Sequence, residues 1–257
     1  MPPKPKFRLF GGPNGSGKTH VFSLFKERGI IHTELYVNAD KIEAELKKRR
    51  KFYFTAYRVK VDHDSFRKHI IESGLFKEKI KDKSFIDHFS IEAGVLQIGE
   101  KIKINSYHAS FVATYLAERL FDTHQSFAFE TVMSHESKID LIKVARQSGY
   151  KTYLYFIFAD AISTNIARVQ LRVLRGGHAV EEQTIKSRAP RTFGLLPKAF
   201  EAADNAYVID NSDNAIPILI KEGSNISRAK KFPGIINKAI HVILRRLPKD
   251  FTLNVEN

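Results

Sequence analysis

The chain has 257 residues, of which 43% are hydrophobic and 27% charged, values that are ordinary for a folded globular protein. It contains no cysteine, which excludes disulfides, thiolate metal sites and cysteine nucleophiles. Its 42 Lys and Arg against 28 Asp and Glu give a net charge of +14. This charge favours an anionic partner but does not choose between nucleic acid, an acidic protein, a membrane surface and a phosphorylated small molecule.

A phosphate-binding loop follows the first predicted strand. Residues 7–10 are a short apolar run typical of a buried strand, and residues 19–28 carry apolar side chains at helical spacing. The segment between them fits G-x-x-x-x-G-K-S/T and consists of Gly12, Pro13, Asn14, Gly15, Ser16, Gly17, Lys18 and Thr19. In such loops backbone N–H groups surround a phosphate chain, the lysine contacts the β- and γ-phosphates, and the final hydroxyl can bind Mg²⁺. The segment predicts a nucleoside triphosphate site.

Asp40 lies just past the second predicted strand, residues 34–38, and at the start of a predicted helix. There it could accept a proton from an attacking hydroxyl, or cap the helix, or do both. The region that follows, about residues 47–105, looks like a basic insertion. We expect a hairpin or an irregular segment over residues 52–64 and mostly helical structure over residues 65–104.

Strands and helices alternate regularly in the rest of the chain. The predicted elements are a helix over 107–123, a strand over 126–129, a helix capped by Ser134 and ended by Gly149, a strand over 150–158, a helix over 162–175 capped by Asp160, a helix over 181–203, a strand over 206–209, an edge strand over 216–220 and a helix over 235–244 that packs on the core.

This order predicts an α/β protein with the three-layer sandwich of P-loop NTPases and a mostly parallel sheet. We expect a single kinase-like domain over residues 1–257, with a mostly helical basic insertion and a helical lid. Ligands of such sheets lie at the carboxyl ends of the strands, where Asp40, Glu130 and Asp210 would project.

Glu130 and Thr131 close an apolar strand. An acidic residue at this place can hold Mg²⁺ or grip a substrate, although a solvated strand end is the simpler interpretation. Further along the chain, Arg168, Arg172 and Arg175 recur at helical spacing, and Arg188 and Arg191 follow a glycine pair. Residues 168–192 therefore suit a lid whose arginines contact a triphosphate, with a solvated basic face as the alternative.

Four motifs in this order resemble the zeta toxin family of kinases. They are residues 12–19, Asn38-Ala39-Asp40, Phe127-Ala128-Phe129-Glu130-Thr131 and residues 168–180, which include His178; Asp210-Asn211-Ser212 also matches. The resemblance covers roughly residues 7–46 and 107–215, and it does not include the insertion.

The resemblance implies an ATP-dependent phosphotransferase that uses Mg²⁺ and phosphorylates a hydroxyl of a small phosphorylated molecule. In the best-known members this molecule is UDP-N-acetylglucosamine; here a nucleotide sugar of that kind and a dinucleotide are both candidates. By the resemblance, Lys18 and Thr19 bind ATP and Mg²⁺, and Asp40 is the base. Glu130 and Thr131 lie at the substrate, and Arg172 and Arg188 contact the phosphates.

The resemblance also implies a protein partner, because toxic members of the family are commonly held inactive by an antitoxin. An acidic protein would suit the charge of this chain.

The competing hypothesis is a nucleic-acid-binding ATPase or a polynucleotide kinase. Its support is the basic segment 47–60, which holds several aromatic residues, and a late basic cluster. Aromatic rings beside cations can stack on bases, but they can equally form the core of an insertion. The late cluster consists of Arg228, Lys230, Lys231, Arg245, Arg246 and Lys249.

The sequence shows no sign of membrane insertion. No apolar stretch approaches the roughly 20 residues of a membrane helix, and the basic N-terminus leads directly into a predicted strand, which argues against a signal peptide. The absence of cysteine fits a reducing compartment. We therefore expect a cytoplasmic protein, with delivery to another cell left open.

Overall fold

The computed structural model of the chain describes residues 3–177, 179–248 and 251–256. The chain divides into two compact units, which are described separately below. Unit 1 comprises Met1–Glu34 and Ser126–Asn257, and unit 2 comprises Leu35–Gln125. Two residues named above, His178 and Lys249, lie outside the described residues. Within the described part of the chain, no helix is long and apolar enough to cross a membrane.

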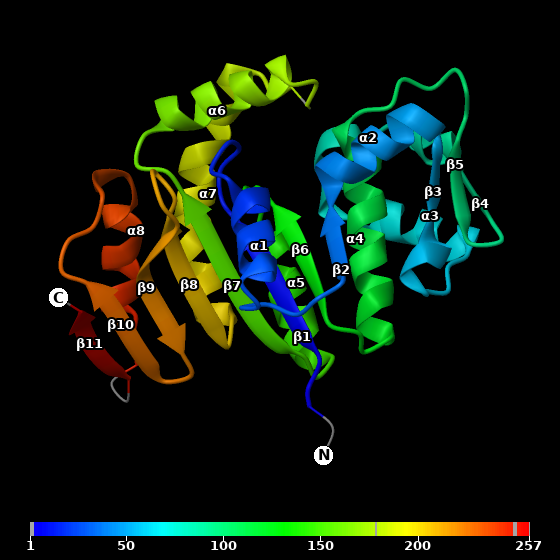
Figure 1. The fold of residues 1–257 in the computed structure, drawn as a ribbon. Helices are drawn as coiled ribbons and strands as arrows, with labels where there is room; N and C mark the ends of the chain where they lie inside the picture. The colour runs from blue at the N-terminus through cyan, green and yellow to red at the C-terminus, as the bar shows by residue number, and fades with distance from the viewer. Residues whose placement is uncertain (1–2, 178, 249–250, 257) are drawn as a thin grey trace. The chain divides into compact units, whose positions relative to one another are not determined.

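A mostly parallel sheet forms the centre of unit 1 (Figure 1). In unit 1 the strands lie in the order β11-β10-β9-β8-β7-β1-β6. Strand β1 pairs in parallel with β6 and β7, and β7 pairs in parallel with β8, whereas β9 is antiparallel to both neighbours. The bounds are β1 (Lys6–Gly11), β6 (Phe127–Thr131), β7 (Lys151–Phe158), β8 (Asn205–Asp210), β9 (Ile216–Glu222), β10 (Asn225–Ala229) and β11 (Thr252–Glu256).

Strand β9 was expected at the edge of this sheet, and that expectation is wrong. Strands β10 and β11 continue the sheet beyond it, with β10 antiparallel to β9 and parallel to β11. Their sequences, NISRA and TLNVE, are short and mixed in polarity. NISRA shows little alternation of apolar and polar residues, whereas TLNVE alternates strictly and its own pattern is that of a strand.

Helices cover both faces of the sheet and complete the predicted three-layer sandwich (Figure 1). Helix α1 (Lys18–Glu27) covers one face, and α5 (Ser137–Gln147), α7 (Glu182–Ala202) and α8 (Gly234–Arg245) pack together on the other. Helix α6 (Ile162–Leu174) packs on α7. As expected, α8 buries its apolar face, including Ile236 and Ile240.

Two predicted helix caps in unit 1 are wrong. Helix α5 begins at Ser137 rather than after Ser134, with Glu136 at its N-cap and the N–H of Ser137 donating to His135 Nδ1 (3.2 Å). Helix α6 has Ala161 at its N-cap. The backbone N–H of Asp160 instead donates to Ser212 Oγ (2.9 Å), so this residue belongs to the junction with the loop after β8.

Unit 2 combines helices with a small antiparallel sheet. Residues 65–104 are helical only as far as His88, because β4 and β5 then form a hairpin about Gly94, which has φ +77°. The sheet order is β3-β5-β4. The elements are β2 (Leu35–Asn38), α2 (Ala39–Arg49), β3 (Lys51–Tyr53), α3 (His63–Glu72), β4 (Phe89–Glu92), β5 (Val95–Ile98) and α4 (Ser106–Asp122), with short helices over Phe54–Tyr57, Phe76–Ile80 and Lys83–His88.

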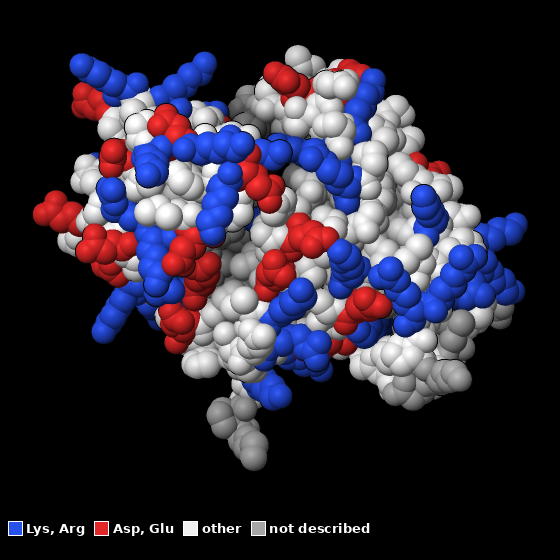
Figure 2. All heavy atoms as spheres, turned by 180° about the vertical axis from the view of Figure 1, so that it is seen from behind, with Lys and Arg blue, Asp and Glu red and all other residues white. Residues whose placement is uncertain are grey.

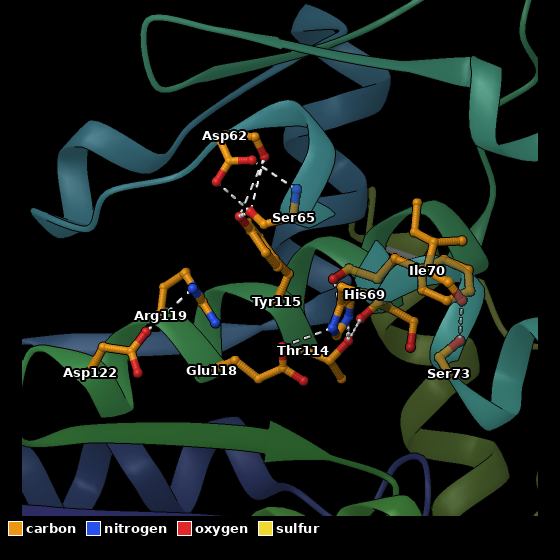
Figure 3. A network of polar contacts seen from close by, with 12 residues as sticks. Asp62, Ser65, His69, Ile70, Ser73, Thr114, Tyr115, Glu118, Arg119 and Asp122 are labelled. Carbon is orange, nitrogen blue, oxygen red and sulfur yellow. Dashed lines mark hydrogen bonds and ion pairs between the residues drawn. The ribbon is translucent and has the colours of Figure 1, made fainter. Parts of the chain in front are cut away.

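A polar network joins α3 to α4 inside unit 2 (Figure 3). The ring of His69 lies between Glu118 Oε2, 2.9 Å from its Nδ1, and Thr114 Oγ1, 2.9 Å from its Nε2. The hydroxyls of Ser65 and Tyr115 share a hydrogen bond of 2.5 Å. These contacts fix the packing of the two helices beside an aromatic core.

The aromatic residues of segment 47–60 belong mainly to that core. Phe52 and Phe54 are fully buried, and Tyr57 stacks on Phe52 with ring centroids 5.7 Å apart. Buried rings cannot stack on bases, so Phe52 and Phe54 give no support to the nucleic-acid hypothesis, whereas Tyr53 is exposed. Figure 2 shows acidic side chains interspersed with basic ones on the face that it presents.

Candidate functional site

The predicted phosphate loop connects β1 to α1 in unit 1 and closes tightly on its neighbours. Gly15 has φ +77°, and a Cβ there would lie 2.1 Å from the carbonyl oxygen of Asn165 in α6. Gly17 has φ +88°, and a Cβ there would lie 2.2 Å from Asn211 Nδ2. Both positions therefore require glycine for two reasons, the backbone conformation and the absence of space.

Lys18 is buried at the start of α1 and lies against the loop. Its Nζ donates to the carbonyl oxygens of Gly12 and Pro13, each at 2.9 Å. Helix α1 has Gly17 at its N-cap, no side-chain cap and no acidic residue in its first turn. The dipole of this helix and the N–H groups of its first turn favour an anion there.

Thr19 and Glu130 are brought together by the fold. Thr19 Oγ1 donates to Glu130 Oε2 at 2.8 Å, which joins α1 to the end of β6. A hydroxyl and a carboxylate are ligands that suit Mg²⁺. No group of three or more His, Cys, Asp or Glu in the described residues could hold a metal ion. A cation between Thr19 and Glu130 would therefore need phosphate oxygens and water to complete its shell.

The side chain of Thr131 has a different hydrogen-bond partner from that of its neighbour Glu130. Its Oγ1 accepts the N–H of Met133 at 3.2 Å, in the loop that follows β6. Lys138, for which the sequence suggested no role, lies on α5 with its Nζ 5.7 Å from the centre of the Phe129 ring. Burial lowers the pKa of this lysine to about 8. A partly desolvated ammonium beside the strand that carries Glu130 could bind an anionic substrate.

The predicted lid arginines occupy two helices. Arg168 donates from its guanidinium to the carbonyl oxygens of Asn211 (2.8 Å) and Ser212 (2.6 Å), so it holds the loop after β8. Arg172 is half-buried one turn later on α6, and Arg188 is half-buried on α7. The segment 168–192 is thus the end of α6, a glycine turn and the first half of α7.

Asp40 belongs to unit 2 and lies in the first turn of α2. The cap of this helix is Asn38, whose Oδ1 accepts the N–H groups of Asp40 (2.8 Å) and Lys41 (3.1 Å). The alternative in which Asp40 caps the helix is therefore wrong, because Asn38 already does so. Asp40 itself is half-buried.

A short segment of the sequence is similar to a segment of a curated protein. No family model matches the chain. A protein of Haemophilus influenzae (strain ATCC 51907 / DSM 11121 / KW20 / Rd), described as an uncharacterized protein, is 34% identical over 65 residues, which make up 25% of this chain and 46% of that protein. The match thus spans about half of the relative.

The fold is shared with the crystallised complex of AvrRxo1-ORF1 and AvrRxo1-ORF2. The complex with sulphate ions aligns with a TM-score of 0.55 and 14% identity, over 96% of this chain and 65% of that chain. The complex with ATP aligns with a TM-score of 0.54 and 15% identity, over 95% and 65%. This chain therefore spans slightly less than two thirds of that longer one. A structure of the PezAT toxin-antitoxin system of Streptococcus pneumoniae aligns more weakly, with a TM-score of 0.43 and 13% identity over 95% and 85%.

Proposed function

We propose that this protein is an ATP-dependent kinase that transfers the γ-phosphate to a hydroxyl of a small phosphorylated molecule. The observation that carries the proposal is the pair Thr19 and Glu130, 2.8 Å apart, beside a loop with the sequence and shape of a phosphate cradle. Its acceptor would be a nucleotide sugar of the UDP-N-acetylglucosamine kind or a dinucleotide, because the net charge of +14 favours a polyanion.

The loop and the first turn of α1 would bind the phosphates of ATP. Lys18 would exchange the carbonyl oxygens of Gly12 and Pro13 for oxygens of the β- and γ-phosphates. Thr19 and Glu130 would hold Mg²⁺, which neutralises charge on the phosphates when it is bound. Arg172 and Arg188 would contribute further positive charge to the transferring group.

Asp40 would serve as the base. In the transfer, the acceptor oxygen forms a bond to the γ-phosphorus, the bond from that phosphorus to the bridging oxygen breaks, and ADP leaves. The proton of the acceptor hydroxyl passes to the carboxylate of Asp40. The resemblance of residues 38–40 to the zeta toxin motif and the place of Asp40 in the first turn of α2 support this role.

The structural neighbours agree with the proposal. The AvrRxo1-ORF1:AvrRxo1-ORF2 complex, which shares the fold, was crystallised with ATP. That complex contains two proteins, and with the zeta toxin resemblance and the net charge of +14 it supports an acidic, antitoxin-like partner as part of the proposal.

The proposal is tested by incubating the protein with γ-labelled ATP, Mg²⁺ and a panel of acceptors: UDP-N-acetylglucosamine, dinucleotides, nucleosides and oligonucleotides. We expect label on a small phosphorylated acceptor, and a loss of at least a hundredfold in Asp40→Asn, on the order expected when a general base is removed. Glu45→Gln is the control, since Glu45 is also half-buried on α2. Labelled oligonucleotides alone would favour the nucleic-acid hypothesis, and full transfer by Asp40→Asn would exclude Asp40 as the base.

A further inference from the structure

The phosphate loop is held from outside by the residue that follows β8. Asn211 Nδ2 donates to the carbonyl oxygen of Ser16 at 2.8 Å. Ser16 is fully buried, and Asn211 is 6% exposed. Since Gly17 packs against the same amide, the Asn211 side chain covers residues 16 and 17 from one side. The bond spans 195 positions of the chain, so it depends entirely on the tertiary fold.

This hydrogen bond fixes the direction of a donor of the loop. The peptide group between Ser16 and Gly17 is planar and trans, so its N–H points opposite to its carbonyl. With the Ser16 carbonyl directed at Asn211, the N–H of Gly17 is directed away from Asn211. Gly17 precedes the lysine of the motif, in the part of the loop whose N–H groups bind phosphate. Asn211 therefore sets the orientation of a phosphate donor without facing the phosphate itself.

Asn211 is itself held at both ends of its backbone. Its N–H donates to the carbonyl oxygen of Phe158 at the end of β7 (2.8 Å), and its carbonyl accepts from Arg168 Nη1 (2.8 Å). Arg168 Nη2 donates in addition to the carbonyl of Ser212 (2.6 Å). The hydroxyl and N–H of Ser212 both donate to Asp210 Oδ1. The backbone of the residue whose side chain contacts the loop is thus fixed by several hydrogen bonds.

We propose that Asn211 is a positioning residue of the nucleotide site, and that Arg168 acts through Asn211 instead of contacting phosphate. The inference rests on the proposed function only in taking the loop as a polyphosphate site; it does not depend on which acceptor is phosphorylated. Preorganised N–H donors bind an anion without a free-energy cost of reorientation. Loss of the Asn211–Ser16 hydrogen bond should therefore weaken binding of the phosphate chain itself.

The test is calorimetric titration of ATP and of inorganic pyrophosphate into wild-type protein, Asn211→Ala and the control Asn205→Ala. Asn205 is also a buried asparagine, at the opposite end of the same strand β8. We expect Asn211→Ala to weaken both ligands by about tenfold, and Asn205→Ala to leave both unchanged. If Asn211→Ala does not fold, Asn211→Leu, which keeps the size of the side chain, takes its place.

A double variant distinguishes two roles of Arg168, the support of Asn211 and a direct contact with phosphate. If Arg168 acts through Asn211, Arg168→Met weakens pyrophosphate binding in the wild-type background and adds nothing to Asn211→Ala. Equal pyrophosphate affinity of wild type and Asn211→Ala, or an equal loss in Asn205→Ala, would overturn the role of Asn211. An additive loss from Arg168→Met would overturn that of Arg168. These titrations detect no phosphate transfer, so a failed kinase assay with intact, Asn211-dependent binding contradicts the proposed function alone.

Discussion

Thr19 Oγ1 donates a hydrogen bond of 2.8 Å to Glu130 Oε2, although 111 positions separate the two residues in the chain. The bond joins the first turn of α1 to the carboxyl end of β6. It places two oxygen ligands at the end of the phosphate loop, where a cation that accompanies a triphosphate would bind.

Replacing Glu130 by Gln should therefore weaken the binding of Mg²⁺ at the nucleotide site more than it weakens the binding of the nucleotide itself. The amide keeps the shape of the side chain but removes the charge that a hard cation prefers. We expect the Mg²⁺ concentration for half-maximal ATP binding to rise about tenfold, measured by titration at fixed ATP. Glu136→Gln is the control, since Glu136 is exposed and pairs with Lys198. An unchanged Mg²⁺ requirement in Glu130→Gln would exclude a metal role for this carboxylate.

Replacing Lys18 by Met should abolish most of the affinity for ATP. The ammonium lies on the carbonyls of Gly12 and Pro13, within the loop, so its loss removes charge from the phosphate site. We expect about a hundredfold weaker binding by calorimetry, as for the loss of charge-assisted hydrogen bonds. Lys26→Met, at the other end of α1, removes an exposed ion pair with Glu34 and should bind ATP normally. Equal affinities for Lys18→Met and wild type would contradict the assignment of the loop.

A methyl group at Gly15 should cost far more stability than the same change at Gly176. Both glycines have a left-handed backbone, with φ +77° and +80°, but only Gly15 has a neighbour in the way, the carbonyl oxygen of Asn165. The backbone penalty alone is about 1–2 kcal/mol, and the clash at Gly15 should add about 1–3 kcal/mol. Urea unfolding of Gly15→Ala and Gly176→Ala measures the difference, and equal losses would show that the loop can move away from α6.

The stability of unit 2 should fall as the pH is lowered below about 6.5. His88 Nδ1 lies 3.1 Å from His108 Nε2. Burial of the His108 ring lowers its pKa to about 4, and the neighbouring His88 contributes to this shift. Between these values the unfolded chain binds a proton that the native protein does not, so protonation favours unfolding. From pH 6.5 to pH 5 the loss should be about 1.6 kcal/mol.

Unfolding in urea at the two pH values, for wild type and His108→Asn, isolates this contribution. The variant should lose less stability than wild type over the interval, while His241→Asn, at an exposed position on α8, should behave as wild type. Identical pH dependence in wild type and His108→Asn would show that His108 does not titrate differently on folding.

Local pattern was sufficient for much of this protein. The loop over residues 12–19 is recognised from contiguous residues, because its glycines, lysine and threonine act within one turn of the chain. The alternation of strands and helices predicted the three-layer sandwich, since buried strands and amphipathic helices have different periods. The short strand β10 was not predicted because its pairing partners, and not its own pattern, make it a strand. Strands β11 and β4 were also missed, although TLNVE and FSIE alternate as strands do.

The tertiary structure alone decided how the site is assembled. The pair Thr19 and Glu130, and the bond from Asn211 to Ser16, join segments 111 and 195 positions apart. Sequence spacing could nominate Arg168 for a lid, but only the fold showed its guanidinium on the carbonyls of residues 211 and 212. The reason is physical: periodicity and turn chemistry act over a few residues, whereas a hydrogen bond between distant segments depends on strand order and register, which the whole sheet sets together.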